Sequence, residues 1–285
     1  MWLTAAFMVV EAAGGLLAGS LALLADAGHM LTDTAALSFA WIALRLSRRP
    51  ADRKRSYGYH RFQVLAAFVN GMVLLGIVIW IGFEAVHRLQ APVEVLGGLM
   101  LAVACGGLAV NLVVLRILRS GERPSLNVRG AALHVFGDLL GSVAAITAAG
   151  VILATGWTPI DPLLSLVVAL LILRSAWHLV RQSGHILLEG TPGDLDLAQL
   201  RSELIDSVAE VDDVHHMHAW SLTDERPLVT LHAHIVDGAD QQSALRRIKR
   251  LLRDRFGISH ATVQIERGRC ADDHGRQDVE RAHRG

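Results

Sequence analysis

Two short patterns of histidine and aspartate carry the clearest chemistry in this sequence. His29 and Asp33 are four residues apart, and so are His134 and Asp138. Residues at this spacing lie one turn apart on the same face of a helix, so each pair would point an imidazole and a carboxylate in one direction. If the two helices face each other, their two nitrogens and two oxygens would form a tetrahedral site that suits Zn²⁺.

The surroundings of these pairs are apolar, which makes their presence costly. An Asp at the centre of a membrane-spanning helix costs roughly 2.5–3.5 kcal/mol, so such residues usually mark a pathway or a site. The alternative is that each pair only joins helices through hydrogen bonds, but that role does not require the same pair twice. Small residues that would let the two helices approach closely are Ala25, Ala27, Gly28, Gly137, Gly141 and Ser142. Asp26 would line the outer half of a pathway or lie at its mouth, and Glu11 would serve a proton path or a polar helix contact.

A second group of histidines lies near the end of the chain. His215, His216 and His218 fall in one predicted strand, and His232 and His234 fall in the next. Side chains alternate between the faces of a strand, so His216 and His218 would share one face. Adjacent antiparallel strands could then bring His218 near His232 or His234. This arrangement predicts a zinc site, and the alternative is that the histidines are solvated on the sheet surface.

The elements that position these residues fall into an apolar part and a polar part. The chain has 285 residues, of which 52% are hydrophobic, with a mean hydropathy of +0.38 and zero formal net charge. Apolar residues dominate before Glu189 and charge concentrates after it, which predicts a membrane part followed by a soluble part. Zero net charge argues against nucleic acid as a partner. The two cysteines, Cys105 and Cys270, do not suggest a disulfide framework.

Six apolar stretches are long enough to cross a membrane, for which ~20 residues are needed. They cover residues 1–19, 22–46, 62–87, 95–118, 129–154 and 160–180. Basic residues concentrate in the second and fourth links and at their edges, at Arg48, Arg49, Arg53, Lys54, Arg55, Arg61, Arg116, Arg119, Arg123 and Arg129. Because basic loops stay on the cytosolic side, both termini and the polar part are predicted to be cytosolic. The apolar start has no basic n-region, so we expect no cleaved signal peptide and expect a short cytosolic arm to be missing before it.

The polar part alternates helices and strands. Residues 195–209 and 241–256 predict amphipathic helices, and residues 214–222, 228–236 and 261–266 predict strands. The order α-β-β-α-β is that of a small two-layer α+β unit, near the lower size limit for independent folding, so dimerisation would help it. The charged tail after Gly268 is predicted to be disordered, although its Cys270 and His274 could contact a metal.

These motifs together resemble the cation diffusion facilitator family, and most of all its bacterial zinc exporters. The resemblance rests on residues 20–33 (SLALLADAGHMLTD) and 133–142 (LHVFGDLLGS), and it continues through residues 57–61, 161–162, 187–190 and 218–221. It therefore covers nearly the whole chain. It implies a mainly α membrane protein with six transmembrane helices over residues 1–185, a cytosolic ferredoxin-like α+β domain over 190–268 and a tail over 269–285. It also implies a homodimer in the bacterial inner membrane.

The resemblance assigns residues as well. Family members build their transport site on helices 2 and 5, and the matching residues here are His29, Asp33, His134 and Asp138. The version with two His and two Asp is associated with zinc in preference to manganese or iron, and Cd²⁺ or Co²⁺ would fit the same ligands. The positions that bind regulatory zinc in the cytosolic domain of some members match His218, His234 and Glu266, with His232 and His260 as alternatives.

The expected activity follows from the protonation of these ligands. Protonation removes the ability of His and Asp to bind metal, so Zn²⁺ and protons compete for the site. A site that alternates between the two sides of the membrane would exchange Zn²⁺ for protons, and the inward proton gradient would drive export. The alternative is a membrane protein that senses Zn²⁺ without moving it.

Two other possibilities are disfavoured by the sequence. A metalloenzyme would carry Glu-x-x-His pairs for two irons or a His-Glu-x-x-His motif, and neither occurs. In the link between the second and third stretches His60 stands alone, so no zinc site is expected there. Arg61 in the same link would pair with an acid such as Glu189.

Overall fold

A computed structural model of the protein describes residues 2–47, 52–119, 126–268, 270 and 272. Within its helices the side chains of several residues, Asp33 and His134 among them, lie outside the described part of the structure. The chain divides into two compact units. The first comprises residues 1–50 and 65–182, and the second comprises residues 51–64 and 183–285.

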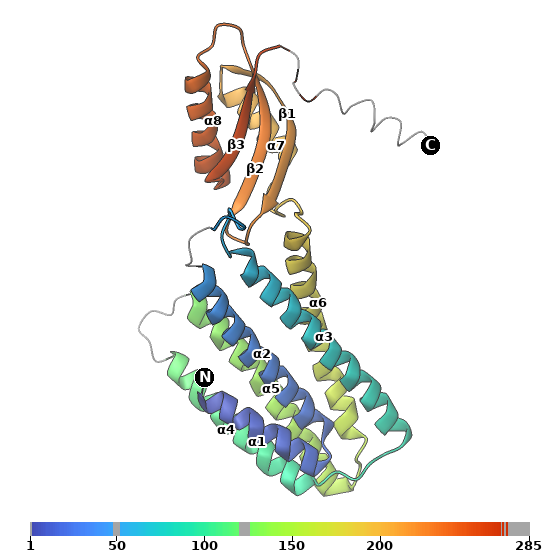
Figure 1. The fold of residues 1–285 in the computed structure, drawn as a ribbon. Coiled ribbons are helices and arrows are strands. Elements are labelled where there is room, and N and C mark those ends of the chain that lie inside the picture. The colour runs from blue at the N-terminus through green and yellow to red at the C-terminus, as the bar shows by residue number, and fades with distance from the viewer. Residues whose placement is uncertain (1, 48–51, 120–125, 269, 271, 273–285) are drawn as a thin grey trace, which may run out of the picture. The chain divides into compact units, whose positions relative to one another are not determined.

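Six long helices form the first unit and its connections to the second (Figure 1). They are α1 (Trp2–Ala18), α2 (Leu21–Ser47), α3 (Arg61–Gln90), α4 (Gly97–Arg119), α5 (Leu126–Thr155) and α6 (Ile160–Leu187). Each lies over one of the six apolar stretches. Among the residues that the structure describes, four segments are long and apolar enough to cross a membrane, namely Arg61–Gln90, Gly97–Ile117, Asp138–Thr155 and Ile160–Leu187. The described parts of α1 and α2 contain the shorter apolar segments Ala6–Ala18 and Leu21–Thr32.

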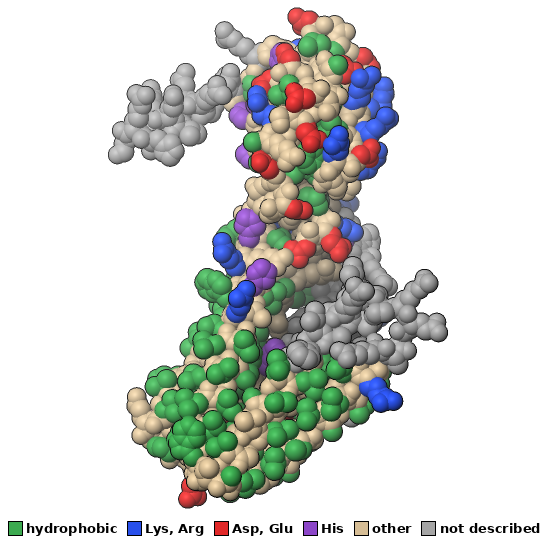
Figure 2. All heavy atoms as spheres, turned by 180° about the vertical axis from the view of Figure 1, so that it is seen from behind, with side chains coloured by type: hydrophobic (Ala, Val, Ile, Leu, Met, Phe, Trp, Pro, Cys, Tyr) green, Lys and Arg blue, Asp and Glu red, His purple; other side chains and the backbone are tan. Residues whose placement is uncertain are grey.

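The surface of these helices is apolar. Figure 2 shows hydrophobic side chains covering the helices, while Lys, Arg, Asp and Glu gather on the other unit. Leu17, Phe83 and Leu170 are exposed by 72, 76 and 63%. Exposing apolar surface to water costs about 25 cal/mol per Å², so a surface of this kind suits lipid. The helical unit is therefore the membrane domain of a multi-pass protein.

The central helix of this unit is α2. It contacts α1 and α5 directly. One apolar cluster joins it to α1, α4 and α5 through residues such as Leu23 and Met100. A second cluster joins it to α3 and α6 through residues such as Leu21 and Ile81. The helix that carries His29 is therefore packed on several sides near its start.

The first turn of α2 is also capped by a residue from α6. The fully buried Asp161 carboxylate accepts hydrogen bonds from the Ser20 hydroxyl at 2.7 Å and from the backbone N–H groups of Leu21 at 2.7 Å and Ala22 at 3.2 Å. The N–H groups of a first helical turn have no partner within the helix, and a carboxylate also interacts favourably with the helix dipole. Asp161 thus fixes the start of α2 against α6.

The second unit has the predicted order α-β-β-α-β. Its elements are α7 (Leu197–Ser207), β1 (Val211–Ser221), β2 (Pro227–Ile235), α8 (Gln241–Phe256) and β3 (His260–Glu266). The strands form one sheet in the order β1-β2-β3, with β1 antiparallel and β3 parallel to β2. The two helices pack on the sheet through a buried core that includes Leu200, Leu204, Ile248 and Leu252. This unit is the C-terminal α+β domain.

Strand β1 contains a bulge that sets the direction of its histidines. His215 lies opposite His232, whereas His218 lies opposite Thr230, so three steps along β1 match two along β2. The extra residue interrupts the alternation of side chains. His216 within the bulge has a φ of 46°, a conformation that few residues other than glycine adopt.

Candidate metal sites

In the membrane domain, the histidine of the first His–Asp pair lies close to the aspartate of the second pair on a neighbouring helix. Nε2 of His29 on α2 lies 3.9 Å from Oδ1 of Asp138 on α5, and their side chains are 21% and 8% exposed. The two helices are therefore close enough for a site that both contribute to. The side chains of Asp33 and His134 lie outside the described residues, and the backbone places each of them in the same helix as its partner.

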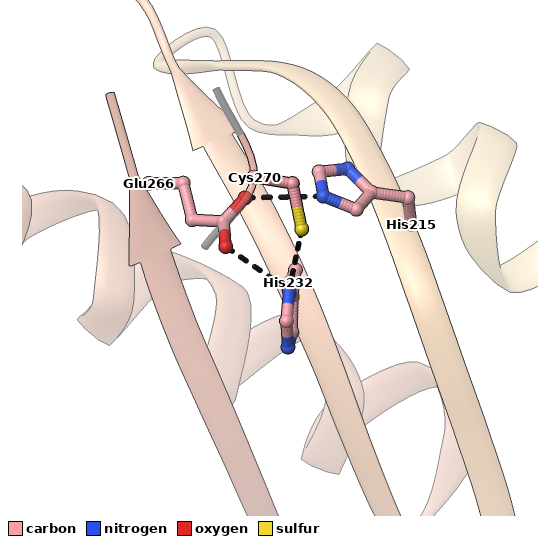
Figure 3. A group of neighbouring side chains, drawn as sticks. All are labelled: His215, His232, Glu266 and Cys270. Atoms are coloured by element: carbon pink, nitrogen blue, oxygen red, sulfur yellow. Dashed lines mark hydrogen bonds and ion pairs between the residues drawn. The ribbon is translucent and has the colours of Figure 1, made fainter. Parts of the chain in front are cut away.

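In the C-terminal α+β domain, four side chains from the sheet and the segment after it converge (Figure 3). Nε2 of His215 lies 3.1 Å from Oε2 of Glu266, and Nδ1 of His232 lies 3.0 Å from Oε1 of the same carboxylate. The Cys270 sulfur lies 3.5 Å from Nδ1 of His232. One ligand atom from each of the four residues can be chosen so that all lie within 4.8 Å of one another. Two imidazoles, a carboxylate and a thiol at this spacing could hold Zn²⁺.

A second group of ligands shares His232 with the first. His216, His232 and Asp272 also bring one ligand atom each within 4.8 Å of one another. Nε2 of His232 lies 3.4 Å from Oδ2 of Asp272, on the opposite side of the ring from Nδ1. The Cys270 sulfur is 3.7 Å from Nδ1 of His216. The three rings of His215, His216 and His232 pack edge to face, with centroids 5.0–5.7 Å apart.

The bulge changes which histidines of β1 lie together. Strict alternation places His216 with His218 and leaves His215 on the other face, but the register shift between His215 and His218 interrupts that alternation. As a result His215 and His216 both approach His232. His218 lies opposite Thr230, and among the described residues it belongs to neither ligand group.

The structure places the other predicted histidines elsewhere. His218 lines an open cavity of about 730 Å³ together with residues that include Tyr57 and Trp220. The His260 ring lies edge to face with Tyr57 at 5.8 Å. The ring nitrogens of His234 are occupied by the Asp212 carboxylate at 2.6 Å and the backbone N–H of Gly268 at 2.9 Å.

The pKa values of His234 and of Asp213, which lies beside His215, are shifted from their usual values. The hydrogen bond that Nδ1 of His234 donates to the Asp212 carboxylate raises the pKa of His234 above its usual value. Burial alone would raise the pKa of Asp213, but hydrogen bonds from Arg201 and His215 outweigh burial and lower it. Asp213 therefore stays ionised next to Nδ1 of His215, at 3.0 Å. In this way it orients the ring so that Nε2 faces Glu266.

The predicted ligand set left out His215, His216 and Asp272, which the structure brings to His232 or Glu266, and named Cys270 only as a possible metal contact in the tail. Cys270 and Asp272 lie in the tail that the sequence predicts to be disordered, and the rest of residues 269–285 lies outside the described residues. The available signal was position, because Cys270 follows β3 by only four residues and β3 ends at Glu266. A thiol that follows a predicted carboxylate ligand by four residues can reach the same site.

The segment before α3 belongs to the second unit. Arg61 forms the ion pair that the sequence suggested, with its Nη2 3.0 Å from Oε1 of Glu189. The neighbouring His60 lies 2.9 Å from the Arg226 guanidinium. Burial and the Arg226 charge lower the pKa of His60, so its ring is neutral near pH 7.

The comparison with protein families now decides the class of the chain. Residues 1–188 match the cation efflux transmembrane domain, and residues 192–268 match the cytoplasmic domain of cation efflux proteins. The chain belongs to the cation efflux family. This confirms the resemblance that the motifs indicated, and it makes the protein a transporter and not an enzyme.

Individual members of the cation efflux family match over most of their length. A zinc transporter, ZitB, from Yersinia pestis is 53% identical over 94% of this chain and 86% of its own. A cadmium, cobalt and zinc/H⁺–K⁺ antiporter from Bacillus velezensis is 42% identical over 91% of this chain and 84% of its own. Among solved structures, the metal-bound C-terminal domain of the CzcD transporter from Cupriavidus metallidurans is 29% identical, covering 25% of this chain and 99% of that domain with a TM-score of 0.24.

Proposed function

We propose that this cation efflux protein exports Zn²⁺ from the cytosol in exchange for protons. The transport site would consist of His29, Asp33, His134 and Asp138. The observation that supports it best is the 3.9 Å approach of His29 on α2 to Asp138 on α5, because these are the two helices that carry the paired ligands. The zinc relatives named above point to the same ion.

The ligand chemistry supports exchange with protons. A neutral imidazole and an ionised carboxylate bind Zn²⁺, and a proton on either removes that ability. Binding of the metal therefore releases protons, and arrival of protons on the other side releases the metal. The relative from Bacillus velezensis is named as a proton-coupled antiporter for cadmium, cobalt and zinc, so Cd²⁺ and Co²⁺ are further substrates to test.

The proposed topology places all six helices across the bacterial inner membrane. Basic residues flank the α2–α3 and α4–α5 links, which keeps these links, both termini and the α+β domain in the cytosol. We propose that the domain has a ferredoxin-like architecture and that two chains form a homodimer. The boundaries would be residues 1–185 for the membrane domain, 190–268 for the cytosolic domain and 269–285 for the tail.

We further propose a regulatory zinc centre in the cytosolic domain. Its ligands would be His215, His232, Glu266 and Cys270, joined by His216 and Asp272 around the shared His232. Glu266 is only 6% exposed and its carboxylate lies between two imidazoles, which supports a shared ligand role for the three. His234 is left out of this set because Asp212 and Gly268 occupy its ring nitrogens, and His260 because it packs against Tyr57. His218 is left out because it lines a separate cavity and belongs to neither group.

Zinc uptake into proteoliposomes with an imposed pH gradient tests the main proposal. We expect zinc flux to depend on the gradient and to be lost in Asp138→Ala, while the protein still elutes as a folded dimer. Zinc flux that does not depend on the pH gradient would contradict antiport. Zinc flux at the wild-type rate in Asp138→Ala would show that Asp138 is not a ligand of the site. A wild-type protein that binds zinc but moves none would favour the sensor.

Calorimetry with Zn²⁺ tests the cytosolic centre separately. His232→Ala removes the ligand that both groups share, so fewer zinc ions should bind per chain. His218→Ala is the matched control, because it removes a histidine two positions from His216 that lies outside both groups. Equal binding by the two variants would contradict the proposed ligand set.

A further inference from the structure

A second set of buried oxygens lies beside the proposed transport site. Glu11 on α1, Asp26 on α2 and Ser142 on α5 are 1, 4 and 0% exposed. Asp26 precedes His29 by three residues and Ser142 follows Asp138 by four. Each is therefore about one turn along its own helix from a proposed zinc ligand, and a turn rises ~5.4 Å.

Glu11 and Ser142 have polar atoms that meet few donors. Both carboxylate oxygens of Glu11 and the hydroxyl oxygen of Ser142 are fully buried and accept no hydrogen bond from the described residues. The polar group beside Glu11 is a second carboxyl, that of Asp26, and the charge of Asp138 also acts on Glu11. Two neighbouring buried carboxyls can interact favourably only through a shared proton or a cation, because two negative charges at this distance repel each other. A divalent cation would bind where the proton otherwise lies.

Gly107 and Gly141 have no side chain, and this leaves room for these oxygens between the helices. A Cβ atom at Gly107 on α4 would lie 3.3 Å from both Oε1 of Glu11 and Oγ of Ser142, so these two oxygens flank the same point. A Cβ at Gly141 on α5 would lie 2.9 Å from Oδ1 of Asp26, which is closer than side chains tolerate. Four helices thus contribute either an oxygen or the room for it.

We propose that Glu11, Asp26 and Ser142 form a second divalent-cation subsite, which receives the ion as it leaves the His–Asp site. The inference rests on the proposed transport function and on its topology. With the cytosolic ends assigned as above, α2 runs inward and α5 runs outward. Asp26 and Ser142 then both lie on the outer side of His29 and Asp138.

The chemistry of the subsite suits release. It offers only oxygen atoms, whereas the transport site also offers imidazole nitrogens, which bind Zn²⁺ well. An ion that moves outward therefore passes from a stronger to a weaker set of ligands. Its carboxylates also keep the ion from crossing a purely apolar stretch, where an unpaired charge is very costly.

The experiment measures zinc flux against zinc concentration in proteoliposomes, for Glu11→Gln and Asp26→Asn. We expect turnover to fall about tenfold or more while KM changes by no more than about twofold, because loading uses the unaltered His–Asp site. Glu84→Gln is the matched control, a carboxyl-to-amide change on α3 at a residue that pairs with Arg88. Glu11→Asp, which keeps the charge, should recover part of the turnover.

A second measurement counts radioactive zinc bound to the purified dimer at saturating concentration. Each amide variant should bind one ion fewer per chain than the wild type and the control, with unchanged thermal unfolding. The proposal is overturned by wild-type turnover in both variants, by an unchanged zinc count, or by a KM that rises in proportion to the loss of turnover. Failure of the transport proposal is distinct, since there the wild type shows no flux or Asp138→Ala retains it.

Discussion

Removing the Asp161 carboxylate should detach the start of α2 from α6. The side chain is fully buried and accepts three hydrogen bonds, from the Ser20 hydroxyl and from the backbone of Leu21 and Ala22. In Asp161→Ala these three donors lose their acceptor in a place that water does not reach. Ser20 replaces it only in part, because its hydroxyl is itself one of the three donors and its oxygen already accepts from the backbone N–H of Leu23 at 3.3 Å, which leaves one lone pair.

The size of the effect follows from the number of bonds. Hydrogen bonds to a charged group contribute ~1.5–3 kcal/mol each, so losing three costs roughly 4–6 kcal/mol if the weaker 3.2 Å bond to Ala22 counts least. A domain of this size loses ~2–4 °C of Tm per kcal/mol, which predicts a fall of about 10 °C or more. Asp161→Asn keeps one acceptor oxygen but turns an amide N–H toward a donor, so roughly half the loss is expected.

Thermal unfolding of the detergent-purified protein, followed by circular dichroism, measures this effect. Asp196→Ala is the matched control, since Asp196 caps α7 with two local bonds on an exposed site. A cap of that kind contributes only ~1 kcal/mol, and only to the cytosolic domain. If Asp161→Ala unfolds within about 2 °C of the wild type, the three bonds do not hold α2 as argued.

Three other changes test the cytosolic domain. Ile248→Ala, in its buried core, should lower the free energy of unfolding in urea by ~2–5 kcal/mol, whereas Leu188→Ala, at a side chain that is 84% exposed, should leave it nearly unchanged. The Asp212 hydrogen bond raises the pKa of His234 from 6.5, so its stabilisation is complete below that value and is lost as pH rises through the raised pKa. His234→Gln should therefore flatten the fall of stability between about pH 6 and pH 8, and an unchanged slope would contradict this origin. Cys270→Ser should weaken zinc binding in calorimetry about tenfold because a hydroxyl is a poorer ligand than a thiolate, while Cys105→Ser in α4 should not.

Hydropathy and amphipathic spacing were enough to predict the elements. Apolar stretches about as long as a membrane is thick leave few alternatives to long helices, and α1 to α6 lie over all six. The α-β-β-α-β order was equally accessible, because buried residues such as Leu200 and Leu204 recur at helical spacing and the strands alternate. The same two signals say nothing about which helix ends are tied together. The Asp161 bonds join residues 139–141 positions apart in the chain, and spacing cannot reveal such contacts.

The proposed cytosolic ligands could not be predicted because one extra residue in β1 changes which of its side chains share a face. Period-two reasoning holds only while the ladder is regular, and the bulge between His215 and His218 breaks it. Nothing in the run of three histidines marks where the extra residue falls. Its conformation at His216, with φ at 46°, is unfavourable for a residue other than glycine. The strain is retained where it brings a third imidazole to His232, as expected if the bulge serves the centre.

The packing of α2 is uneven along its length, and this bears on how its ion site opens. Its buried apolar side chains run from Leu21 to Met30, and none of its described side chains after Thr32 is buried. The proposed ligand His29 thus lies near the end of the packed half, with Asp161 capping the far end of that half. We infer that this packing and the cap close the outer route. Release outward then requires the packed half of α2 to loosen, so a weakened Asp161 cap should favour the outward-open state as well as lower stability.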